Sequence, residues 1–160
     1  MGIKLRLYYE WFNLRTGKIK FIIKNESTGF ERISYYKNTI VNAGKDAILS
    51  HIGGLNVNSN PAEITYGAVG TDSTAIVAGD TTLGTELKRN VTIQVSESSQ
   101  TLTMRVYYSP GTATGTIREF GWFGEAATGS ADSGTLFNRV MLNEVIAGTD
   151  SLTVEQDWVM

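Results

Sequence analysis

The run Arg118-Glu-Phe-Gly-Trp-Phe-Gly-Glu125 and the later run Leu136-Phe-Asn-Arg-Val140 are the strongest indication of the fold class. Both runs are short and rich in aromatic and aliphatic residues, and a loop of Gly, Ala, Ser and Thr separates them. Short apolar runs bounded by glycine-rich turns are typical of β-strands. The two runs therefore predict a β-hairpin whose loop spans residues 124–135.

Alternation along the two strands places opposite charges near each other. Glu119 shares a face with Gly121 and Phe123, and Arg139 shares a face with Phe137, because successive side chains of a strand point to opposite sides. Pairing of the strands across the loop lets Arg139 reach Glu119. We therefore expect an ion pair between these two residues.

A second pair of charges lies upstream, at Glu86 and Arg89. We expect residues 81–87 to form a short helical turn, on which side chains three residues apart lie together. The four charged residues Glu86, Arg89, Glu119 and Arg139 then form a partly buried structural network that sets the strand register. Two carboxylates of this kind also suggest glycoside hydrolysis. A neighbouring arginine lowers the pKa of a carboxyl, which is the wrong direction for a general acid, so the structural interpretation is favoured.

The same patterns recur along the chain. Strands are predicted at 3–13, 18–24, 30–36, 64–70, 91–95, 102–108, 117–123, 136–142 and 152–158, and one helix begins with Asn42 as its N-cap and ends at Gly53. These elements predict an all-β protein: an antiparallel β-sandwich, jelly-roll-like, with one short helix and an N-terminal β-meander or arm. We divide it into a basic β-meander or docking arm (1–40), the helix (41–54) and a sandwich body (61–160), together one compact unit.

Composition excludes several kinds of site. The chain has 160 residues, 41% of them hydrophobic, which suits one domain with a sizeable core. It contains no cysteine and one histidine, His51, so we expect no disulfide, no metal site, no catalytic triad and no cofactor. No apolar run approaches the roughly 20 residues that span a bilayer, so no membrane partner is expected. Loop aspartates are interpreted as solvated turn residues rather than calcium ligands.

Charge is distributed unevenly. Residues 1–45 carry nine Lys and Arg against three Glu, a net charge of +6, and the remainder carries five basic against thirteen acidic residues, a net charge of −8. This asymmetry fits nucleic-acid binding, docking on an acidic protein or a second copy, or a solvated strand face. We favour docking over nucleic acid. The residues expected to provide it are basic or aromatic: Arg6, Tyr8, Trp11, Lys18, Lys20, Tyr35 and Tyr36.

Five motifs occur in a recognisable order. They are Ile64-Thr-Tyr-Gly-Ala-Val-Gly70, Asp80-Thr-Thr-Leu-Gly-Thr-Glu-Leu-Lys-Arg89, Ile117-Arg-Glu-Phe-Gly-Trp-Phe123, Gly134-Thr-Leu-Phe-Asn-Arg139 and Ser151-Leu-Thr-Val-Glu155. Over residues 38–158 this order resembles virion structural proteins of tailed bacteriophages, of the tail-fibre, tail-collar and minor head or decoration types. The chain departs from their pattern at Trp122, where leucine is commoner, and at Ala147-Gly148.

The resemblance implies a non-enzymatic component of the virion, made in the host cytoplasm. We expect it to self-associate as a trimer or ring and to dock on another virion protein of the capsid or the tail. The alternative is a carbohydrate-binding module for host-surface glycans, with Trp11, Trp122 and the 124–135 loop as the sugar platform. In either case the loop presents an exposed surface formed by Glu125, Thr128, Ser130, Asp132 and Ser133.

Overall fold

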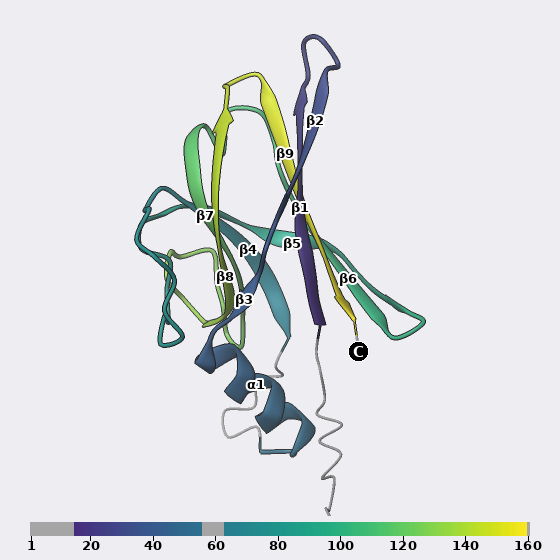
Figure 1. Cartoon of the computed structure of the whole chain (residues 1–160), viewed down its shortest axis with the longest axis vertical. Coiled ribbons are helices and arrows are strands. Elements are labelled where there is room, and N and C mark those ends of the chain that lie inside the picture. The colour runs from purple at the N-terminus through teal and green to yellow at the C-terminus, as the bar shows by residue number, and fades with distance from the viewer. Residues whose placement is uncertain (1–14, 56–62, 160) are drawn as a thin grey trace, which may run out of the picture.

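The computed structural model describes residues 15–55 and 63–159, which form nine strands and one helix (Figure 1). The strands are β1 (Arg15–Asn25), β2 (Glu31–Tyr36), β3 (Thr39–Ile40), β4 (Ile64–Gly70), β5 (Glu86–Ser98), β6 (Thr101–Tyr108), β7 (Gly115–Gly124), β8 (Thr135–Ile146) and β9 (Asp150–Val159), and the helix is α1 (Asn42–Ile52). All pairings are antiparallel. The all-β prediction is confirmed.

The strands belong to one sheet in the order β2-β1-β9-β6-β5-β4-β7-β8-β3. Its first and last strands, β2 and β3, are separated in sequence only by Lys37 and Asn38. The two edges of the sheet are therefore held together, and the sheet must curl around its own inner face (Figure 1). The described residues thus form a curled sheet, closed at one end where β3 pairs with β8.

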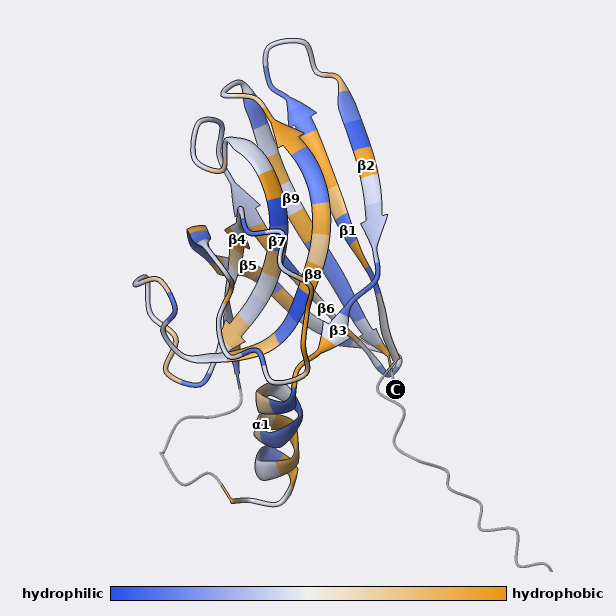
Figure 2. Cartoon of the chain, turned by 60° about the vertical axis from the view of Figure 1, so that its left-hand side comes forward, coloured by the Kyte–Doolittle hydropathy of each residue, from blue (hydrophilic) through white to orange (hydrophobic). Residues whose placement is uncertain are grey.

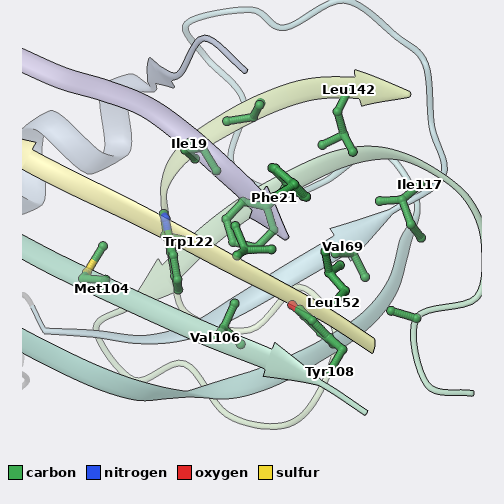
Figure 3. Packing of buried hydrophobic residues seen from close by; sticks show 14 of the residues in the cluster. Ile19, Phe21, Val69, Met104, Val106, Tyr108, Ile117, Trp122, Leu142 and Leu152 are labelled. Atoms are coloured by element: carbon green, nitrogen blue, oxygen red, sulfur yellow. The ribbon is translucent and has the colours of Figure 1, made fainter. Parts of the chain in front are cut away.

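The inner face of this sheet is the hydrophobic core. Hydrophobic and hydrophilic residues alternate along β1 and β9 (Figure 2), as expected for strands with one buried face. Phe21 of β1 packs edge-to-face on Phe120 of β7, which in turn packs edge-to-face on Trp122. Figure 3 shows Phe21 and Trp122 among the buried hydrophobic residues. Burial of large side chains from both ends of the sequence, such as Phe21 and Leu152, holds the curled sheet together.

A polar chain crosses this core. The indole Nε1 of Trp122 donates to Oε1 of Gln156 at 2.6 Å, and Asn138 Nδ2 donates to the same oxygen at 3.0 Å and to Asn38 Oδ1 at 2.7 Å. Trp122, Asn138 and Gln156 have no exposed surface. A buried polar group is costly without a partner, so these bonds constrain how β7, β8 and β9 pack.

The described part of the predicted N-terminal arm is an integral part of the sheet. β1 lies between β2 and β9, and its residues Ile19, Phe21 and Ile23 are buried. Residues 15–40 of the predicted meander are therefore built into the sheet, with the apolar face of β1 buried in the core, and their docking role stays a prediction. The strand predicted at 3–13 lies outside the described residues.

Helix α1 follows β3 and packs on β8. The predicted N-cap is wrong by one residue: Val41 occupies the cap position, Asn42 is already helical, and no side chain caps the helix. Gly44 is the closest point of contact, because a Cβ added there would lie 2.2 Å from the carbonyl oxygen of Phe137. The glycine allows the first turn of the helix to approach the backbone of β8.

Candidate functional site

The outer face of β5, β4, β7 and β8 carries the charged residues that the sequence singles out. In the strand register Arg89 lies opposite Ala68, Ala68 opposite Gly121, and Gly121 opposite Arg139. Directly opposite residues of paired strands share a face. The two arginines therefore stand on the same side of the sheet, separated by two strands that carry only small side chains between them.

Arg139 forms the first of two clusters. Its Nη2 lies 2.8 Å and its Nε 3.0 Å from Glu119 Oε2, and Nη1 lies 2.8 Å from Asp80 Oδ2. Asp72 completes the group, with its Oδ2 3.5 Å from Nη2 of Arg139. We call these four residues the Arg139 cluster. The predicted pair of Glu119 and Arg139 is confirmed, and both side chains are almost fully buried.

Glu119 also binds backbone. Its carboxylate accepts hydrogen bonds from the N–H groups of Gly84 and Thr85, both at 2.9 Å, and from Asp72 at 3.3 Å. These donors belong to the segment that joins β4 to β5. A charged acceptor with several N–H donors forms strong bonds in a water-poor site. Glu119 therefore anchors both ends of the 71–85 loop to the sheet.

Burial lowers the pKa of Arg139, but its hydrogen bond to Asp80 and the charge of Glu119 outweigh that effect and raise the pKa overall. The guanidinium therefore stays protonated. At Asp72 the pKa is lowered, chiefly by a hydrogen bond from the Thr74 side chain. The cluster therefore keeps its opposite charges.

Arg89 forms the second cluster. It makes a bidentate pair with Glu86, with both N···O distances at 2.6 Å, and its Nη1 donates to the carbonyl of Thr128 at 3.2 Å and to the carbonyl of Ser133 at 2.9 Å. The guanidinium also lies 4.4 Å from the centroid of the Phe123 ring. We call Glu86, Arg89, Thr128 and Ser133 the Arg89 cluster.

The helical turn predicted for residues 81–87 is wrong. Glu86 begins strand β5, and a register shift opposite Val69 and Gly70 leaves Leu87 as an extra residue. A bulge of this kind shifts the alternation by one, so residues three apart come to the same face. The bulge, rather than a helix, brings Glu86 and Arg89 together.

The four predicted network residues thus belong to two separate clusters rather than one. A small apolar group lies on the same outer face, made of Val41, Ala68, Leu83, Phe123 and Leu136. Its close packing requires Gly121, where an added Cβ would lie 2.7 Å from Leu136 and 3.1 Å from Leu83. Charge pairs therefore hold the loops over an apolar patch.

The 125–134 loop is tightly structured. Glu125, Ala126 and Asp132 have positive φ, and Ser133 Oγ accepts a bond from the Thr128 N–H at 2.9 Å. Thr128, Ser130 and Asp132 are exposed, whereas Glu125 and Ser133 are half-buried. Glu125 accepts a bond from the Thr135 hydroxyl, and Ser133 contacts Arg89. Of the five loop residues predicted to be exposed, only Thr128, Ser130 and Asp132 at the tip are therefore open to a partner.

The predicted docking residues separate into different surroundings. Lys18 and Tyr35 are exposed, and Lys20 lies half-buried on the outer face, 3.6 Å from Glu155. Tyr36 is misplaced in the prediction: its ring packs on Phe21 inside the sheet, and its hydroxyl donates to Glu144 at 2.6 Å. Arg6, Tyr8 and Trp11 lie outside the described residues.

Glu144 joins the two edges of the sheet where no backbone ladder does. It accepts from Tyr36, and Arg32 Nη2 lies 3.3 Å from its other oxygen and donates to the carbonyl of Val145. Burial raises the pKa of Glu144, but hydrogen bonds from Ser34 and Tyr36 and the charge of Arg32 lower it overall. We call this contact between β2 and β8 the seam.

Sequence reasoning missed several of these residues. Asp72 and Asp80 were interpreted as solvated turn residues. Both lie in one long loop before Glu86, and two carboxylates so placed can bind the same cationic side chain. Glu144 and Gln156 lie in strands with ordinary alternation, so nothing local marks them as partners of distant residues.

The described residues offer few groups for other chemistry. No group of three or more His, Cys, Asp and Glu within residues 15–55 and 63–159 is arranged to hold a metal ion. Trp122 is fully buried, so its place in the glycan platform is wrong. In the part of the chain that is described, no helix has the length and apolar character to cross a bilayer.

Comparison with known proteins does not assign the chain to a family. No protein-family model, no curated protein and no solved structure matches the chain.

Proposed function

We propose that the chain is a non-enzymatic structural subunit of a bacteriophage virion that self-associates and docks on the capsid or the tail. The proposal rests on the contacts of the two buried arginines. Arg89 and Arg139 hold the loops 125–134 and 71–85 in fixed shapes on one face of the sheet. Groups held in such pairs support a rigid surface rather than a reacting site.

The order of motifs supports the same proposal, because the motifs supply both arginines and the carboxylates Asp80, Glu86 and Glu119 of the two clusters. Glu86 and Arg89 come from the second motif, Glu119 from the third and Arg139 from the fourth. We further propose that the curled sheet is a jelly-roll-like β-sandwich. We propose that the protein acts in the virion.

The outer face of β1 and β2 is the proposed docking surface. It carries Lys18, Lys20 and Tyr35, with Ile33 46% and Tyr35 58% exposed. Basic and aromatic side chains on the outer face of these strands suit an acidic protein surface. Exposed aromatic residues of this type supply much of the binding energy at protein interfaces.

The experiment is co-sedimentation of the purified protein with separated heads and tails of the phage that encodes it. Native protein should bind one of the two, and Lys18→Glu/Lys20→Glu should weaken binding, whereas a Lys45→Glu/Lys88→Glu control, with the same charge change elsewhere, should not. Absence of the protein from purified virions by mass spectrometry would overturn the proposal.

A further inference from the structure

Strand β5 changes neighbours halfway along its length. Residues 86–91 pair with β4, and residues 92–98 pair with β6. On the side away from β6, residues 92–98 have no strand partner among the residues that the structure describes. Figure 1 shows the β5–β6 hairpin extending away from β4. We call residues 92–98 the open edge.

The open edge carries two exposed apolar side chains and little charge. Ile93 and Val95 are 59% and 54% exposed, and Glu97 is the only charged residue within 92–98. A register shift at Ile93 bends the hairpin, but the ladder to β6 is regular from Gln94 onward. Unpaired strand edges are usually blunted by lysine, proline or a covering segment, since their free N–H and C=O groups otherwise pair with another strand.

Another open part of the sheet, between β2 and β8, is covered. At the seam, the side chains of Arg32 and Tyr36 reach across to Glu144 and to the carbonyl of Val145. The open edge of β5 has no equivalent bridge among the described side chains. Its exposure therefore marks it as a part of the sheet that is available for pairing.

We propose that the open edge pairs with the open edge of a second copy, antiparallel, about a two-fold axis at Val95. The two curled sheets then become continuous through β5. This inference does not rest on the proposed function, and it concerns a contact between pairs of copies; a ring would need a second interface as well.

The residues favour this register. Pairing of the whole open edge with itself places Val95 opposite the second copy's Val95, Gln94 opposite Ser96 and Thr92 opposite Ser98. The polar pairs can hydrogen-bond across the strands, and the two Glu97 carboxylates face Ile93 rather than each other. A two-fold contact uses both edges at once, so association stops at the dimer.

The absence of cysteine from the chain gives a direct test. In Val95→Cys the two thiols lie across the axis, where opposite residues of antiparallel strands have Cα atoms about 4.5–5.5 Å apart, within disulfide range. Mild oxidation should give a covalent dimer. Val77→Cys, at a loop residue of similar exposure (60%), is the matched control. Equal crosslinking of the two variants would overturn the proposal.

A charge exchange tests the same contact without crosslinking. Light scattering should show a concentration-dependent dimer for the native protein, weakened about tenfold or more in Val95→Lys and in Val95→Glu by like charges at the axis. An equimolar mixture of the two variants should restore the dimer, since Lys then faces Glu. Unchanged melting temperatures show that the variants fold. A monomeric native protein at every soluble concentration, or a mixture no better than either variant, would refute the contact.

Discussion

Glu119 Oε2 lies 2.8 Å from Nη2 and 3.0 Å from Nε of Arg139, and the two residues are 0% and 3% exposed. Removal of one member of a buried pair leaves the other charge without compensation. We expect Arg139→Met to lower the free energy of unfolding by about 3–5 kcal/mol in urea titration.

The control for this substitution is Lys24→Met. Lys24 pairs with Glu26 at 2.8 Å on the surface, where both side chains are more than a third exposed. An exposed pair of this kind contributes little to stability, because water screens the two charges. A loss of similarly small size for Arg139→Met would show that the buried cluster does not stabilise the fold.

Arg89→Lys should loosen the 125–134 loop more than it destabilises the whole protein. Lysine keeps the positive charge but loses the planar fork that binds Glu86, Thr128 and Ser133 together. We expect faster amide hydrogen exchange in the loop, with exchange in β9 unchanged. Arg105→Lys, which removes an arginine pairing with Glu155 at the surface, is the comparison. Unaltered exchange in the loop would mean that Arg89 is not its anchor.

The β5–β6 turn should tolerate glycine better than its native residues. Ser99 and Gln100 both have positive φ, at 51° and 67°, a conformation that disfavours residues with a Cβ. We expect Gln100→Gly to raise the free energy of unfolding by about 0.5–1 kcal/mol. Ser98→Gly, one residue before the turn in the strand, should instead lower it by a similar amount. Thermal melts of both variants should show a higher melting temperature for Gln100→Gly and a lower one for Ser98→Gly.

Stability should fall in acid partly through the seam. The folded state holds the pKa of Glu144 below its ordinary value, so the carboxylate contributes stability above the unfolded pKa of about 4.3. That contribution is lost as pH falls through the lowered pKa of the folded state. Glu144→Gln should therefore be less stable than the native protein at pH 7, and the difference should shrink below about pH 4.

Urea titrations at several pH values provide the measurement for Glu144. Asp132→Asn, which removes an exposed loop carboxylate outside the seam, is the control and should stay close to native stability at pH 7. A difference between Glu144→Gln and native protein that stays constant from neutral to acidic pH would show that the carboxylate does not titrate with folding.

The local sequence pattern was sufficient to predict most of the secondary structure and one side-chain contact. Alternation of apolar residues, glycine-rich turns and a single helical run predicted α1 and most of the described strands, because these signals act over a few residues. The ends were less accessible: β5 runs from Glu86 to Ser98 where 91–95 was predicted, β8 extends to Ile146, and the short β3 was missed. The Glu119–Arg139 pair was also accessible, since the hairpin of β7 and β8 brings the residues together across one loop.

Periodicity and spacing were sufficient to predict an all-β chain with antiparallel strands and two charged pairs inside apolar segments. Three features could be seen only in the folded chain: β1 joins β9 within the sheet, a bulge at Leu87 aligns Glu86 with Arg89, and Glu144 bridges two edges. Strand order depends on which apolar faces can be buried together, and a bulge or a long-range bond depends on the partner strand. Those partners lie up to the length of the chain away, where periodicity carries no signal.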